Sequence, residues 1–121
     1  MPKRPLGQTD IAVTPLGLGS NKFSGARGIM RFYAPDLAQA QVTAIVRAAL
    51  EGGMNWFDTA EMYGFGHSER VLAQALRDLQ KEDDEIIIAT KWTPFFRTAA
   101  NIPRTIDKRI AALDGYQIDL Y

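Results

Sequence analysis

Two apolar runs of the sequence end in side chains that can carry charge or exchange a proton. Asp58 interrupts the run that begins at Asn55, and Lys91 closes the run that begins at Ile86. Tyr63 follows five residues after Asp58. A carboxylate taken out of water without a partner costs several kcal/mol, so we expect Asp58 to be paired. These residue types suggest acid–base chemistry at the ends of two strands.

Strand periodicity predicts where these side chains meet. Because successive side chains alternate between the faces of a strand, positions 56, 58 and 60 share one face, as do positions 87, 89 and 91. If the two strands are parallel neighbours about 4.8 Å apart, Asp58 and Lys91 meet at their carboxyl ends. Tyr63 can then fold back over the pair.

The composition excludes several classes of protein. Hydrophobic residues make up 46% of the chain, charged residues make up 23%, and 14 basic residues balance 14 acidic ones. A basic stripe with interleaved aromatic residues is missing, which argues against a nucleic-acid partner. Cysteine is absent, the start has no apolar leader, and no apolar run approaches a membrane span. We therefore expect a cytoplasmic protein that does not associate with membranes.

The pattern along the chain alternates strands with helices. The predicted elements are a hairpin within 3–15, a strand at 16–19, an irregular segment over 20–35, a helix capped by Asp36 and ended by Gly52-Gly53, a strand from 55, a helix capped by Ser68, a strand from 86, a helix capped by Asn101 and closed by Gly115, and a strand over 117–121. Helical spacing predicts buried stripes at Val42, Ile45, Val46, Ala49 and Leu50, at Val71, Leu72, Ala75, Leu76 and Leu79, and at Ile102, Ile106, Ile110 and Leu113.

A repeat of one strand and one helix predicts an α/β fold with a parallel sheet. Strand starts near 16, 55, 86 and 117 give three complete units and the strand of a fourth. A complete (β/α)8 barrel needs roughly 250 residues. We therefore expect residues 1–121 to form one partial domain, the N-terminal half of a (β/α)8 TIM barrel with four parallel strands and three helices, preceded by a short β-hairpin. A small doubly wound sheet is the alternative.

Several of these motifs together resemble the aldo-keto reductases. The matching pieces are Asp58-Thr59-Ala60, Tyr63-Gly64, Ser68-Glu69 and Ala89-Thr90-Lys91. The resemblance implies an NADPH-dependent oxidoreductase that reduces aldehydes or ketones, with Asp58, Tyr63 and Lys91 as catalytic residues. It also places the family's fourth catalytic residue, a histidine, shortly beyond Tyr121, so the chain is expected to stop before it.

The implied chemistry explains why these residue types occur together. Hydride addition to a carbonyl leaves an alkoxide that needs a proton, and a tyrosine with an ordinary pKa of about 10 is a weak acid near neutral pH. A lysine ammonium beside a phenol lowers the phenol's pKa, and Asp58 would keep Lys91 charged and oriented. The hydride comes from the cofactor. In the resembling family the residues just after the first strand approach the cofactor, so the resemblance implies Gly19, Ser20, Asn21 and Asp58 as candidate cofactor-binding residues.

Other residues have simpler interpretations. His67 is the only histidine and is expected to begin a helix, and without a second histidine or a cysteine we expect no metal site. The Gly17-Leu18-Gly19 sequence fails as a dinucleotide fingerprint because Lys22 stands where the third glycine belongs. Aromatic residues that could line a substrate pocket or cover the barrel mouth are Phe23, Tyr33 and Trp92. Glu69 suits the first turn of a helix without any catalytic role.

Two alternatives to a reductase remain open at this stage. A half-barrel with unpaired sheet edges could be a non-catalytic module that hides those edges by self-association. A family member could also be retained for binding or regulation. Under the reductase hypothesis the partner is a small-molecule carbonyl substrate.

Overall fold

A hairpin and a parallel sheet provide the β structure of the chain. The computed structural model describes residues 1–27, 32 and 35–121. Strands β1 (Arg4–Pro5) and β2 (Ala12–Val13) pair antiparallel. Strands β3 (Leu18–Gly19), β4 (Trp56–Asp58) and β5 (Ile87–Ala89) pair in parallel in that order. The predicted hairpin and parallel α/β sheet are confirmed.

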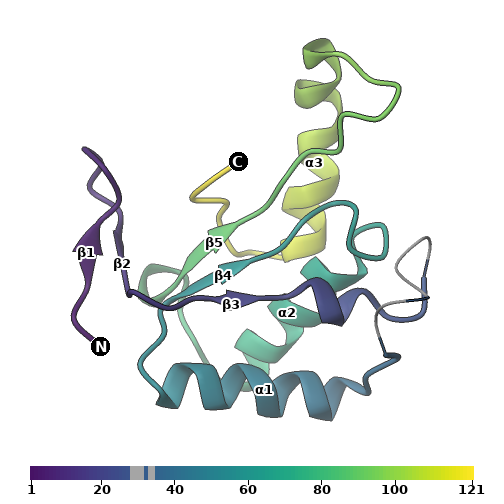
Figure 1. Cartoon of the computed structure of the whole chain (residues 1–121). Coiled ribbons are helices and arrows are strands. Elements are labelled where there is room, and N and C mark those ends of the chain that lie inside the picture. Colours follow the sequence, from purple (N-terminus) through teal and green to yellow (C-terminus); the bar gives the residue numbers. More distant parts are fainter. Residues whose placement is uncertain (28–31, 33–34) are drawn as a thin grey trace.

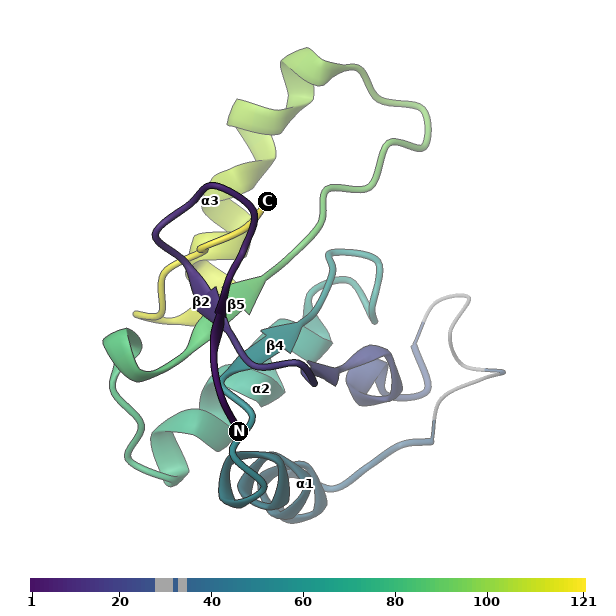
Figure 2. The same ribbon diagram turned by 60° about the vertical axis from the view of Figure 1, so that its left-hand side comes forward.

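Helices cover one face of this sheet. The long ones are α1 (Gln39–Glu51), α2 (His67–Asp78) and α3 (Ile102–Leu113), and short 3-10 turns are η1 (Asn21–Ser24), η3 (Asp83–Glu85) and η4 (Ala99–Asn101). Figure 1 shows α1 and α2 beneath the strands and the hairpin at the end where the strands begin. The turned view in Figure 2 places α3 behind β5. Among the described residues, no helix combines the length and apolar character that crossing a bilayer requires.

The predicted fourth strand is reduced to a single bridge. Leu120 forms an isolated parallel bridge with Ala89. The Asp119 carboxylate accepts the Ile88 amide at 2.7 Å, and the Asp119 amide donates to the Ile88 carbonyl at 2.9 Å. Residues 117–121 therefore occupy the fourth position of the sheet without forming a regular strand.

The core lies between the sheet and the helices. Phe57 and Ile88 point toward the helices and are fully buried, together with Val46, Leu72 and Leu76. Each buried side chain of this size contributes about 1.5–3 kcal/mol to the stability of the fold, relative to the same side chain exposed to water.

The opposite face of the sheet is only partly covered. Ile87 on this face is half-buried, whereas Ala89 on the same face is 9% exposed. Two predicted stripe residues are also exposed, Ile45 on α1 at 38% and Ile110 on α3 at 53%. Ile110 lies in a hollow between α3 and the residues that follow it, together with Ile118 and Tyr121.

Two predicted helix caps are wrong. Helix α1 begins after Ala38, where the Gln41 side chain accepts the Ala38 amide, so Asp36 is not the cap. Helix α2 begins after Gly66, whose backbone is left-handed, and Ser68 lies inside the helix. The Asn101 position is correct for α3, but its side chain accepts the Thr98 amide and so caps the start of η4. Gly52 ends α1 as predicted.

Close packing at the start of the sheet requires a glycine. A Cβ atom at Gly17 would lie 2.1 Å from the Trp56 indole ring. That ring is held in place because its Nε1 donates to the Thr14 carbonyl at 3.0 Å. The group that packs closely against Gly17 is therefore an aromatic side chain of the protein itself.

Candidate functional site

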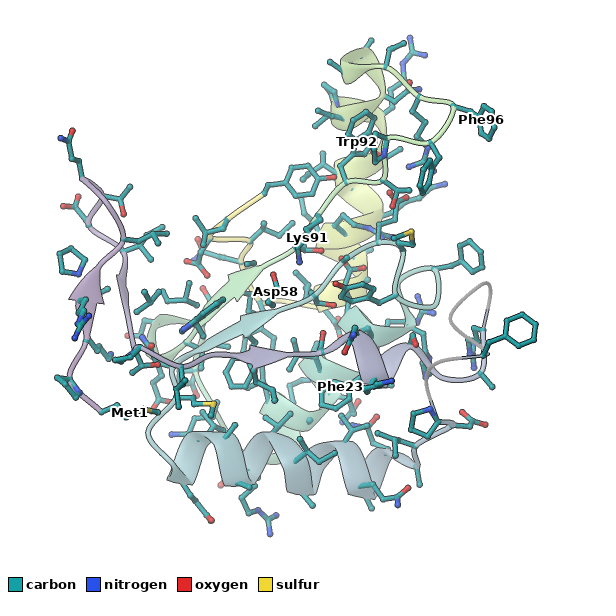
Figure 3. All side chains as sticks on the ribbon, in the orientation of Figure 1. Met1, Phe23, Asp58, Lys91, Trp92 and Phe96 are labelled. Carbon is teal, nitrogen blue, oxygen red and sulfur yellow. The ribbon has the colours of Figure 1, made fainter. Side chains whose placement is uncertain are left out.

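Asp58 and Lys91 form an ion pair where β4 and β5 end. The register aligns Asp58 with Ala89, which places Lys91 two residues further along the same face. The Lys91 ammonium donates to Asp58 Oδ1 at 2.5 Å and to the Thr59 carbonyl at 2.9 Å. Figure 3 shows the two labelled side chains next to one another above the sheet. Two acceptors therefore fix the direction of the ammonium.

Tyr63 completes this cluster. Its ring centroid lies 5.6 Å from Lys91 Nζ, which is within the range of a cation–π contact. The predicted convergence of Asp58, Tyr63 and Lys91 is the arrangement that the structure has. A carboxylate, an ammonium and a phenol can together supply a proton and stabilise the charge left behind.

A tight loop over residues 60–68 holds Tyr63. Its backbone donates to the Ala60 carbonyl at 3.1 Å, and its carbonyl accepts the Ser68 amide at 3.1 Å. Gly64 follows with a positive φ of 69°, and a Cβ there would lie 2.1 Å from the Ser24 carbonyl oxygen. The loop can rest on η1 only because position 64 has no side chain.

Hydroxyl groups join the ends of β3 and β4 below the cluster. Ser68 Oγ donates to the Ser20 carbonyl at 2.8 Å, and Ser20 Oγ donates to the Asp58 carbonyl at 2.9 Å. Thr59 Oγ1 lies 3.1 Å from Ser68 Oγ. Because Ser20, Thr59 and Ser68 are all fully buried, these bonds fix the backbone that carries Asp58.

The predicted cofactor-binding residues have different surroundings. Gly19 pairs with Asp58 across the sheet, and a Cβ at Gly19 would meet no atom within 4 Å. Asn21 is exposed in the first turn of η1. Ser20 is fully buried and its side chain is already hydrogen-bonded. Gly19, Asn21 and Asp58 are therefore open to a ligand, whereas the Ser20 side chain is not.

A second ion pair joins the loops that follow β4 and β5. Arg97 donates to both oxygens of Glu61, at 2.9 and 2.8 Å, and the Thr93 amide donates to Glu61 Oε2 at 3.1 Å. The Glu61 amide in turn donates to the Lys91 carbonyl at 3.1 Å. Glu61 therefore connects the loop that carries Tyr63 to the loop that begins with Lys91.

Protonation of Glu61 should break this connection only at a pH below the usual pKa of a glutamate side chain. Burial by itself raises the pKa of Glu61, but hydrogen bonds from Arg97 and Thr93 and the charges of Arg109 and Arg97 bring the pKa below 4.5. The stabilisation is therefore present above the unfolded pKa and is lost as pH falls through the folded pKa. We expect the Glu61 carboxyl carbon to titrate below pH 4.5 by NMR and Arg97→Gln to raise that midpoint. A wild-type midpoint above 4.5 contradicts this assignment.

A group of buried charges under the site is not predicted from the sequence. Glu69 is fully buried, accepts a hydrogen bond from Thr90 Oγ1 at 2.6 Å, and pairs with Arg109 at 3.1 Å. A signal was available, because Glu69 falls at helical spacing from Leu72 and Leu76 on the buried face of α2. Arg109 likewise lies within the apolar stripe of α3.

The other described residues that the sequence analysis singled out lie outside the cluster of Asp58, Tyr63 and Lys91. Phe23 is buried in the core and does not line a pocket. Trp92 is half-buried on the loop after β5, and Tyr33 lies outside the described residues. His67 begins α2, as predicted. Within residues 1–27, 32 and 35–121, no group of three or more histidine, aspartate or glutamate side chains is arranged to hold a metal ion.

A cleft lies between the loops after β4 and β5. Its volume is about 320 Å³, and its walls are Glu61, Met62, Phe65, Thr93, Phe95 and Arg97. Figure 3 shows Phe96 pointing outward from the same loop as Trp92. The cleft contains the Glu61–Arg97 ion pair, and Asp58, Tyr63 and Lys91 are not among its walls.

Comparison with known proteins shows the family to which the chain belongs. The sequence profile of the Aldo/keto reductase family matches residues 15–121. The chain belongs to the aldo/keto reductase family. It is 30% identical to an L-galactose dehydrogenase from Arabidopsis thaliana, over 97% of the chain and 36% of that protein. The aldo-keto reductase fold is thus expected to place the cluster at the carboxyl ends of barrel strands.

Solved aldo-keto reductase structures share this fold. An enzyme from Bacillus halodurans in its holo form superposes with a TM-score of 0.75 at 28% identity, covering 100% of this chain and 39% of that one. An enzyme from Klebsiella pneumoniae in complex with NADPH superposes with a TM-score of 0.65 at 28% identity, covering 89% and 34%. The chain spans 23% to 40% of the length of three curated relatives. Its fold corresponds to the N-terminal half of a (β/α)8 barrel.

Proposed function

We propose that this aldo/keto reductase chain carries the proton-donating half of an NADPH-dependent carbonyl reductase that converts small aldehydes or ketones to alcohols. The observation that supports this most strongly is the cluster of Asp58, Tyr63 and Lys91 at the ends of β4 and β5. Asp58 ends β4, Lys91 follows the end of β5, and Tyr63 lies on the loop after β4, so the sheet register and this loop bring the three side chains to one place.

The residues open to a ligand fit a nicotinamide cofactor. Gly19 leaves open space on the face that carries Asp58, so a planar ring can approach the backbone there. We assign Gly19, Asn21 and Asp58 as the residues of this chain that would contact it, with Ser20 acting only through the backbone it fixes. When bound, NADPH supplies a hydride.

Each catalytic side chain then has one role. As the carbonyl carbon takes the hydride, the carbonyl oxygen takes a proton from the Tyr63 hydroxyl. The phenolate that remains lies beside the Lys91 ammonium, which stabilises the negative charge. Asp58 and the Thr59 carbonyl accept hydrogen bonds from that ammonium and hold it beside the ring. The proton and the hydride both end on the product, which is an alcohol.

Replacing Lys91 tests this function. Lys91→Met keeps the length of the side chain but removes the charge, so we expect kcat for a reactive aromatic aldehyde to fall by about 100-fold or more, read as NADPH oxidation. The matched control is Lys81→Met, because Lys81 makes an exposed ion pair with Glu85 at 2.9 Å, away from the cluster. Equal turnover in wild type and Lys91→Met would remove the proposed mechanism.

A second candidate is self-association, and one surface favours it. A hollow of about 470 Å³ between α3 and the bridge at Leu120 is lined by Ile106, Ile110, Gly115, Tyr116, Gln117, Ile118 and Tyr121. Ile110 is 53% exposed there. Sedimentation velocity distinguishes the candidates, because a concentration-dependent dimer that Ile110→Lys dissolves supports self-association and a monomer at all concentrations rejects it.

A further inference from the structure

Glu69 contacts the strand that delivers Lys91. It is the third residue of α2, and its Oε1 accepts a hydrogen bond from Thr90 Oγ1 at 2.6 Å. Thr90 is 2% exposed and directly precedes Lys91. Because side chains alternate along an extended backbone, Thr90 points to the helix side of the sheet when Lys91 points to the open side.

A second partner holds Glu69 from α3. Arg109 Nη1 lies 3.1 Å from Glu69 Oε2, and their side chains are 6% and 0% exposed. A Cβ at Gly66 would approach the Arg109 and Arg70 guanidinium groups and Glu69 Oε2 at 3.1 to 3.2 Å. The glycine before α2 therefore leaves room for these charges.

Burying the Glu69–Arg109 ion pair costs free energy, and the stability of the fold does not require it. Burial raises the pKa of Glu69, and the Thr90 hydrogen bond and the Arg109 charge only partly oppose that effect. A buried ion pair can often be replaced by apolar residues without loss of stability. The cost points to a role for Glu69 other than stabilising the core.

Three contacts fix the chain on either side of the Lys91 Cα. The Lys91 carbonyl accepts the Glu61 amide at 3.1 Å, the Thr90 amide donates to the Leu120 carbonyl at 3.0 Å, and the Thr90 side chain is held by Glu69. The regular ladder of β5 has already ended at Ala89. Of the three, the contact with Glu69 is the one that fixes the Thr90 side chain on the helix side of the sheet.

We propose that Glu69 is a positioning residue of the reductase site, which acts through Thr90 to set the direction from which Lys91 reaches Asp58 and Tyr63. The inference rests on the proposed function, because it assigns to Glu69 a part in holding that site. Glu69 itself touches none of the three catalytic side chains. Glu69 acts on the position of Lys91 through Thr90, the residue between the end of β5 and Lys91.

Thr90→Val tests the contact because valine keeps the shape of threonine and removes the hydroxyl group. We expect kcat for a reactive aromatic aldehyde to fall about tenfold, since small displacements of catalytic groups have effects of this size. KM for the aldehyde and the Kd of NADPH should stay within about twofold, because substrate and cofactor surfaces are unchanged. Thr90→Ser restores the hydroxyl and should return kcat to near the wild-type value.

Thr43→Val is the matched control. Thr43 on α1 is 9% exposed and its Oγ1 donates to the Asp78 carboxylate at 3.2 Å, so the same chemical change removes the same kind of bond far from Lys91. Thr90→Val should lose more thermal stability than Thr43→Val, because it leaves the fully buried Glu69 carboxylate without a donor whereas Asp78 is exposed. Only Thr90→Val should lose kcat.

A readout that needs no turnover separates the inference from the proposed function. The Lys91 amine should react slowly with an acylating reagent because two acceptors hold it, and Thr90→Val should raise its labelling rate about threefold by mass spectrometry, relative to exposed Lys108. Thr43→Val should leave that ratio unchanged. Faster labelling in a protein without reductase activity rejects the function and supports the positioning role. Unchanged labelling and kcat in Thr90→Val overturn the positioning role and leave the function standing.

Discussion

Tyr63→Phe should abolish carbonyl reduction while leaving NADPH binding intact. The substitution removes one hydroxyl group and keeps the ring over Lys91, whose Nζ lies 5.6 Å from the ring centroid. A positioned general acid contributes about 100- to 10,000-fold to a rate, so we expect kcat to fall by that factor. Stopped-flow NADPH oxidation gives the rate, and quenching of protein fluorescence gives cofactor affinity.

Tyr116→Phe provides the control for that experiment. Tyr116 donates to the Lys81 carbonyl at 2.7 Å, on the side of the protein where the strands begin. Losing this hydrogen bond should cost about 1 kcal/mol of stability and leave kcat unchanged. Retention of full activity in Tyr63→Phe would show that another group donates the proton.

Arg109→Met should be among the most destabilising single substitutions in α3. It leaves the Glu69 carboxylate buried without its counterion, and breaking a buried ion pair in this way costs about 3–5 kcal/mol. Lys81→Met breaks an exposed pair of similar length, with side chains 33% and 44% exposed, and should cost less than about 1 kcal/mol. Urea unfolding of the two variants compares them directly.

The pH dependence of Arg109→Met has a definite sign. Burial already raises the pKa of Glu69 above 4.5, so the folded protein binds more protons than the unfolded chain between the two pKa values. Stability from this residue therefore falls as pH rises through that window. The defect of Arg109→Met should be smallest near pH 4.5 and largest near neutral pH. Adding Glu69→Gln, which removes the charge, should recover most of the loss, and a fully additive double variant would contradict the ion-pair explanation.

The meeting of Asp58 and Lys91 could be predicted because strand periodicity is simple. Side chains alternate with a period of two, and a parallel neighbour fixes which ends coincide. The structure has the register this requires, with Asp58 opposite Ala89. The spacing of about 31 residues between later strands correctly indicated one strand and one helix per unit.

The role of buried polar residues could not be predicted from local pattern. Ser68 was expected to cap α2 because it is a small polar residue at an element end, whereas the family resemblance made Ser20 a candidate cofactor contact. The hydroxyl groups of Ser20 and Ser68 lie 2.8 Å apart in the interior. Glu69 was expected only to suit a helix start, and its burial depends on Arg109, which lies 40 residues later on α3. Pairings between distant segments require the packed helices, which no single window of sequence describes.

The Ser20–Ser68 contact joins residues 48 positions apart, and Lys91 lies a further 23 positions along the chain. Closing loops of this length costs entropy before any contact repays it, so these pairings form late in folding. During synthesis the hairpin and α1 emerge from the ribosome well before Lys91 does. Asp58 is therefore without its partner Lys91 during the early part of synthesis. The geometry of the cluster forms only when β5 packs against β4.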